Sequence, residues 1–248
     1  MLRKLLLSSV AATAMIGSAL AADLPSRRPP PPVVPLVPVF TWTGFYVGVD
    51  GGYGSQQIRE TGIFGGLPFY QLNYRASGPV GGGHAGFNWQ VSQFVFGMEG
   101  DVLGTSMRVT GPLNTFLFNN AVWRSGVEGS IRGRIGIAWD RFMVYGTGGV
   151  AFETFRLRQN FPLGVIAGDT FTPTRAGLTV GGGVEYAFTN NWLARVEGRY
   201  SDFGTFNNAS VVLPGLFYRE RVTEVKVTGG ISYKFDYAAP AAPVVARY

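Results

Sequence analysis

Residues 127–154, VEGSIRGRIGIAWDRFMVYGTGGVAFET, decide the fold of this 248-residue chain. Isoleucines at 131, 135 and 137 fall on one face of an extended chain and arginines at 132 and 134 on the other, which is the period of a β-strand. The alternation breaks at Asp140 and Arg141 and resumes at Phe142. The stretch therefore predicts two strands, 127–139 and 142–154, joined by a tight turn.

The same alternation predicts eight strands along the chain, at about 43–54, 78–90, 93–104, 127–139, 142–154, 175–188, 191–203 and 221–235. Tight turns alternate with long loops near 55–77, 105–126, 155–174 and 204–220. Prolines are expected in loops (68, 112, 162, 173 and 214) or at a strand start (79), because proline donates no ladder hydrogen bond. A strand of ~12 residues tilted by ~40° rises about 30 Å, enough to cross a membrane. The expected fold is an all-β, eight-stranded antiparallel up-and-down transmembrane β-barrel over residues 42–236.

Four of the five tryptophans return to one edge of this predicted barrel. They lie near the ends of strands, at Trp42, Trp89, Trp139 and Trp192. In membrane barrels, aromatic residues gather at the level of the lipid headgroups. The four tryptophans are therefore predicted to form an aromatic girdle at the interface beside the tight turns.

The N-terminus predicts export. A positively charged start precedes an apolar run, and small residues at Ala19 and Ala21 place a signal-peptidase cut before Ala22. Residues 1–21 are thus a predicted signal peptide. A single membrane anchor is the alternative, and the shortness of the run and the polar residues directly after it argue against that reading.

Two segments flank the predicted barrel. Residues 22–41 are proline-rich and predict a stiff periplasmic linker, and residues 237–248 form an alanine- and proline-rich tail. Both termini then lie on the side of the tight turns.

The composition excludes some kinds of site and favours one class of partner. The chain has no cysteine, which excludes disulfides and cysteine-based metal sites. Its formal net charge is +6, carried mostly by arginine. The basic residues show no nucleic-acid-binding signature, so anionic lipid is favoured over nucleic acid as a partner.

Strand parity places many charged residues on one face. A soluble sandwich would turn the apolar face inward and a membrane barrel would turn it outward; export and strand length favour the barrel. The lumen then holds Asp50, Glu99, Asp101, Glu128, Glu153, Glu185, Glu197 and Glu224 with Arg132, Arg134, Arg195, Arg199, Lys226 and Lys234. An eight-stranded barrel has room only for its own side chains, and buried charges must pair. The sequence favours a salt-bridged plug over a selectivity filter.

The long loops are predicted to form a basic outer rim. They carry arginines at 59, 75, 108, 124, 156, 158, 175, 219 and 221 against Glu60, Asp169, Asp202 and Glu220. Such a rim is either ordinary solvated surface or a contact for lipopolysaccharide phosphates, which arginine binds in bidentate geometry.

Several motifs resemble one family. Trp42-Thr43-Gly44-Phe45-Tyr46-Val47-Gly48, Arg132-Gly133-Arg134-Ile135-Gly136, Tyr145-Gly146-Thr147-Gly148-Gly149-Val150-Ala151 and Tyr200-Ser201-Asp202-Phe203-Gly204 are similar to segments of small alphaproteobacterial outer-membrane β-barrel proteins, described as porin-family or immunogenic surface proteins. The resemblance implies a barrel distantly akin to the membrane domain of OmpA, residing in the outer membrane of a Gram-negative bacterium. It also implies assembly by the outer-membrane insertion machinery, with Tyr233 and Phe235 as the last-strand signal. Some relatives are described as haem-binding, but the resemblance identifies no residue for that role.

Motifs for catalysis or cofactor binding are weak. Residues 81–86, GGGHAG, match a dinucleotide-binding pattern, but a strand pattern follows where that motif requires a helix. His84 is the only histidine, so it cannot form a histidine-based metal cluster, and parity turns it toward the lumen. We therefore expect no enzymatic activity and no cofactor.

These observations favour a structural, surface-exposed outer-membrane protein that contributes to envelope integrity and presents loops to the outside. Two alternatives stay open. One is a narrow pore for small solutes, and the other is a receptor for a haem-like ligand.

Overall fold

The computed structural model describes residues 40–115, 118–160, 170–172, 174–210 and 214–235. The predicted signal peptide with its cleavage site at Ala19, Ala21 and Ala22, almost all of the linker and the C-terminal tail lie outside these residues. Within the described ranges there is no helix long and apolar enough to cross a membrane.

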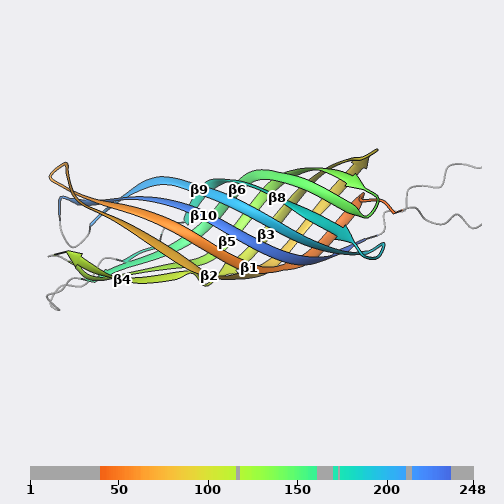
Figure 1. Ribbon diagram of the computed structural model, residues 1–248. Coiled ribbons are helices and arrows are strands. Elements are labelled where there is room, and N and C mark those ends of the chain that lie inside the picture. Colours follow the sequence, from red (N-terminus) through yellow and green to blue (C-terminus); the bar gives the residue numbers. More distant parts are fainter. Residues whose placement is uncertain (1–39, 116–117, 161–169, 173, 211–213, 236–248) are drawn as a thin grey trace, which may run out of the picture. The chain divides into compact units, whose positions relative to one another are not determined.

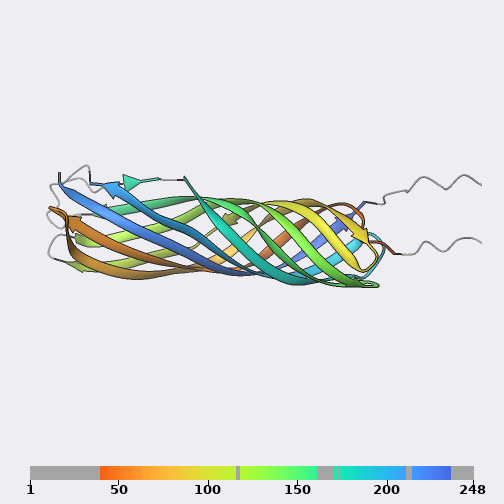
Figure 2. The same ribbon diagram turned by 90° about the horizontal axis from the view of Figure 1, so that it is seen from above.

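The described residues form ten strands: β1 (Gly44–Phe64), β2 (Leu67–Val91), β3 (Phe94–Thr105), β4 (Arg108–Thr115), β5 (Phe118–Trp139), β6 (Phe142–Asn160), β7 (Thr170–Phe171), β8 (Thr174–Ala187), β9 (Trp192–Ala209) and β10 (Leu216–Lys234). Eight of them pair in the cyclic order β1-β2-β3-β5-β6-β8-β9-β10, and β10 pairs with β1. Every pairing is antiparallel, and the ring is visible in Figures 1 and 2. The predicted fold class is confirmed.

The strands run much further than the sequence pattern indicated. β1 and β2 stay paired through the stretch 55–77, which was expected to be a loop, with one register shift between Gly62 and Ile63, and meet at a two-residue turn. That turn is Gly65–Gly66, with φ of 59° and 84°. Positive φ at both central residues is the type I′ geometry that suits a twisted hairpin, and glycine adopts it without strain.

Three prolines lie inside strands, which corrects the expectation that all of them fall in loops or at a strand start. Pro68 and Pro112 are in β2 and β4, and Pro79 pairs with Tyr53 within β2. Pro79 lies just past the last β2–β3 pair, Val80 with Thr105, and before the contact with β4. At this change of neighbour the ladder needs no donor from residue 79 on that side.

The outer face of the ring is apolar over most of its length. We call this outer face the apolar belt. Its upper limit is the one away from the tight turns. Seven exposed residues mark that limit: Tyr53, Val102, Val127, Phe152, Leu178, Tyr200 and Val225. The interior is lined by buried charged and polar side chains. This distribution is inverted relative to a soluble sandwich and matches a barrel in lipid.

Candidate functional site

Trp42 is buried inside the lumen at the end of the tight turns. Its side chain is 0% exposed, its ring packs edge-on against Phe40 with centroids 5.2 Å apart, and it clusters with Met143. The indole N–H donates to the carbonyl of Asp140 at 3.0 Å, and the backbone N–H donates to Gln90 Oε1 at 2.8 Å. The expectation that Trp42 joins the girdle is therefore wrong. The residue precedes β1, where no strand alternation fixes its direction.

The other three tryptophans point outward at the same end. Trp89 is 60% exposed, and Trp139 and Trp192 are similarly open. Tyr233 packs edge-on against Trp192 with centroids 5.3 Å apart and against Phe235 at 5.2 Å. An aromatic girdle of these three tryptophans, and an assembly signal at Tyr233 and Phe235, stay predictions.

Every charged residue assigned to the lumen is buried. Arg132 lies at the centre of the cluster: Nη2 donates to Glu99 Oε1 at 2.6 Å and to Asp101 Oδ2 at 2.9 Å, and Nη1 donates to Glu197 Oε1 at 2.6 Å. Arg199 donates to the same Asp101 at 3.0 Å. The guanidinium of Arg132, on β5, thus holds three carboxylates from two other strands, β3 and β9.

Arg134 and Arg195 extend the cluster toward Trp42. Arg134 Nη2 donates to Glu185 Oε2 at 2.6 Å, and Nη1 lies 3.3 Å from Glu99 Oε2. Arg195 Nη2 donates to Asp50 Oδ2 at 2.7 Å and Nη1 to Glu99 Oε2 at 2.5 Å. Buried charges are tolerated where such bonds satisfy them, so the four arginines and their carboxylates form a connected cross-brace through the barrel.

His84 joins β2 to β1 and β10 inside the lumen. Nδ1 lies 2.7 Å from Asp50 Oδ2, and Nε2 lies 2.8 Å from Ser232 Oγ. This is the partner order of a serine–histidine–aspartate triad, which the separations of these residues in sequence did not indicate. A catalytic serine must reach a substrate carbonyl beside an oxyanion hole. Ser232 is 1% exposed, and Arg195 also binds Asp50, so the chain of bonds is structural.

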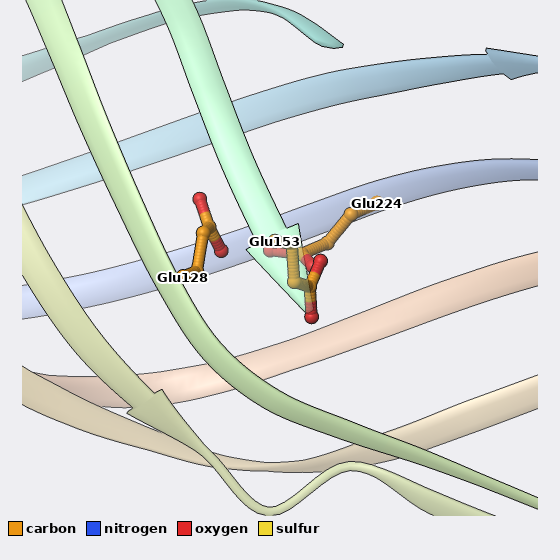
Figure 3. Close-up of side chains that lie close together, drawn as sticks. All are labelled: Glu128, Glu153 and Glu224. Atoms are coloured by element: carbon orange, nitrogen blue, oxygen red, sulfur yellow. The ribbon is translucent and has the colours of Figure 1, made fainter. Parts of the chain in front are cut away.

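Further from the tight turns, three carboxylates converge (Figure 3). Oxygens of Glu128, Glu153 and Glu224 lie within 4.8 Å of one another, a spacing that could hold a metal ion. Protein side chains already contact these carboxylates. Lys226 contacts Glu128 and lies 2.8 Å from Glu224, and Gln56 Nε2 donates to Glu153 at 2.8 Å and to Glu224 at 2.8 Å. The lysine ammonium thus already pairs with two of the three carboxylates, and Gln56 bonds the third.

An apolar layer fills the lumen beyond these carboxylates. The fifth tryptophan, Trp123, packs against Phe155 with centroids 5.1 Å apart, and Phe155 against Phe203 at 5.3 Å. Ile58 and Met107 are buried in the same cluster. Sequence reasoning missed this layer because it assigned Trp123 and Met107 to a loop; a large aromatic inside a supposed loop was the available signal.

Glu60 and Glu220 lie beyond the apolar layer and point into the barrel. They are direct partners in the β1–β10 register, and both are buried. Tyr70 donates its hydroxyl to Glu60 Oε1 at 2.7 Å. Both acids were expected on the outer rim, and the structure corrects this: the strands continue past the apolar belt, so parity still turns the two side chains inward.

Glu220 makes this end of the barrel sensitive to pH. Burial, and next the charge of Glu60, raise the pKa of Glu220 from 4.5 to about 8. The folded chain therefore holds a proton that the unfolded chain releases, and its stability falls as pH rises from about 4.5 through about 8. We expect faster backbone hydrogen exchange in the ends of β9 and β10 at pH 9 than at pH 6, after correction for the intrinsic rate. Glu220→Gln should abolish the difference, and replacement of the outward-facing, half-buried Asp202 by Asn should leave it unchanged. An unaltered pH dependence in Glu220→Gln would contradict the assignment.

A closed antiparallel ring with an apolar outer face and a charged interior defines a transmembrane β-barrel. Residues 9–237 match the sequence profile described as "Outer membrane protein beta-barrel domain". The chain belongs to this family and is an outer-membrane protein.

Curated relatives agree with the family. The chain is 35% identical to the 31 kDa outer-membrane immunogenic protein of Brucella melitensis, over 94% of this chain and 100% of the relative. It is 31% identical to the 25 kDa outer-membrane immunogenic protein of Brucella abortus, over 94% and 99%. Among solved structures, the outer membrane protein OprG of Pseudomonas aeruginosa superposes with a TM-score of 0.55 at 15% identity, covering 80% of this chain and 99% of OprG. The likeness to OprG concerns the fold alone.

Proposed function

We propose that the protein is a structural, surface-exposed component of the outer membrane that contributes to envelope integrity and has no enzymatic activity. The observation that carries the proposal is the filled lumen. From one end to the other it contains the Trp42 cluster, the arginine–carboxylate cross-brace, the three glutamates with Lys226, and the apolar layer. A continuous water path through these layers would require the ion pairs to separate.

Presentation at the surface is the second part of the proposal. Two relatives carry the word immunogenic in their names, which supports exposure of the strand extensions and their turns to the outside. Outer-membrane lipid, including lipopolysaccharide, and the barrel-assembly machinery are the proposed partners, the latter through Tyr233 and Phe235. No cofactor and no nucleic acid is part of the proposal.

The alternative of a narrow pore predicts a different electrical behaviour. The purified protein, reconstituted in planar bilayers, should show no steady conductance, because each arginine of the cross-brace is held by carboxylates. A stable, reproducible single-channel current would favour the pore. A receptor for a haem-like ligand would instead give a saturable shift of the ligand's absorption spectrum on titration.

A further inference from the structure

The outer face carries a belt of arginines just beyond the apolar belt. Seven arginines point outward and are exposed, at positions 59, 75, 108, 124, 156, 219 and 221. Glu60 and Glu220, which would have balanced part of this charge, point inward instead. Among the residues whose side chains are described at this end, Asp202 is the one outward carboxylate. The belt is therefore strongly positive.

Three of these arginines line one groove on the outside of β1, β2, β9 and β10. The groove has a volume of about 560 Å³ and is bordered by Arg59, Arg75 and Arg221, with Ser55, Gln57 and Thr223 between them. Its wall nearest the membrane is formed by Tyr200 and Val225, which are the last residues of the apolar belt on their strands. The groove thus joins a cationic upper part to an apolar lower part.

The charges in the groove are poorly balanced by the protein. Arg59 lies directly opposite Arg221 in the β1–β10 register, an arrangement that destabilises a strand pair through like-charge repulsion. Arg221 donates to Asp202 Oδ2 at 2.8 Å. Within the described residues, Arg59 and Arg75 make no ion pair. An anion seated among the three guanidinium groups would relieve the repulsion.

We infer that this groove binds the phosphate group of a phosphorylated glycolipid in the outer leaflet of the membrane. Guanidinium groups bind phosphate oxygens in pairs of charge-assisted hydrogen bonds. Arg221 precedes Val225 by four residues, so it lies roughly 10 Å above the end of the apolar belt for a strand tilted by ~40°. A lipid whose acyl chains follow Tyr200 and Val225 brings its phosphate to this height. The inference rests on the membrane location and deepens the proposed contact with lipopolysaccharide.

A second row of arginines provides a matched control. Arg108, Arg124 and Arg156 are direct partners across β4, β5 and β6 and also point outward. Replacing this row removes the same charge from the same belt without touching the groove. The comparison separates a site from a general attraction of basic protein for anionic lipid.

The test uses the mature protein, folded in detergent, with fluorescent lipid A as the probe. R59Q/R75Q/R221Q should weaken binding by about tenfold or more, since each arginine supplies a charge-assisted bond, while R108Q/R124Q/R156Q should weaken it less than about threefold. Lipid A from which the phosphates have been removed should bind the parent as weakly as lipid A binds the groove variant. If the triple groove variant does not fold, Arg75→Gln alone should still weaken binding.

Three results would overturn the inference. They are equal losses in both triple variants, equal binding of lipid A without phosphates, and displacement of lipid A by inorganic pyrophosphate at equal concentration, which would indicate a site for soluble anions. Each is independent of the lumen. Failure of the groove in these tests would leave the proposal of a closed, structural barrel intact. A barrel that conducts ions and still binds lipid A would contradict only the proposed structural role.

Discussion

Arg132→Ala should lower the stability of the barrel more than any other arginine replacement. The substitution leaves Glu99, Asp101 and Glu197 without the group that binds all three, and these carboxylates are at most 1% exposed. Removing one partner of a buried ion pair typically costs about 3–5 kcal/mol. The expected result is a marked fall in the temperature at which the folded barrel, which migrates anomalously in electrophoresis without boiling, converts to the unfolded form.

The control for this experiment is Arg124→Ala. Arg124 is exposed on the outer face, so its loss should leave the conversion temperature close to that of the parent. If the two variants convert at the same temperature, the cross-brace does not stabilise the barrel. A conductance that appears in Arg132→Ala and is absent from the parent would show, in addition, that Arg132 keeps the lumen closed.

At the tight-turn end of the lumen, Trp42→Ala should lower the stability of the barrel more than any other replacement. The indole is fully buried, packs on Phe40 and Met143, and satisfies the carbonyl of Asp140. Truncation of a buried tryptophan costs about 3–5 kcal/mol through the lost contacts and the cavity that remains. The temperature at which the folded barrel converts to the unfolded form should fall. A fluorophore attached beside Phe40 should become accessible to a water-soluble quencher in the variant, whereas it should stay protected in the parent.

Trp89→Ala is the matched replacement. Its side chain is exposed on the outer face and contributes little to internal packing. Equal destabilisation by the two replacements would mean that Trp42 stands at the membrane interface after all, as the spacing of the tryptophans suggested.

The fold could be predicted from the sequence wherever lipid imposes the alternation. Within the apolar belt one face must be apolar and the other holds charge, so Arg132 and Arg134 on one side of a strand and Ile135 on the other are enough to orient it. Beyond the belt the rule weakens. Ile58 and Glu60 share the inner face there, while the outer face meets water, and neither face has a uniform chemistry.

The partners within the lumen could not be predicted in the same way. Parity shows that a side chain points inward, but the contact between Asp50, His84 and Ser232 depends on how three strands are staggered. A shift of register by two residues would keep every face the same and replace every partner. The sequence does contain a signal for the hairpin turn at Gly65 and Gly66, although the stretch was predicted as a loop, because two glycines between extended segments favour a type I′ turn.

The length of β1 and β2 determines what an antibody can recognise. The turn at Gly65 and Gly66 follows Tyr53, the end of the apolar belt on β1, by about a dozen residues, which at ~3.3 Å each and a tilt of ~40° raises it about 30 Å above the hydrocarbon. Residues 55–77 are paired strands with alternate side chains turned inward. Antibodies raised against the folded protein should therefore recognise conformational epitopes made of side chains from neighbouring strands. Such sera should lose most of their binding when the barrel is boiled, and short linear peptides from 55–77 should compete with them poorly.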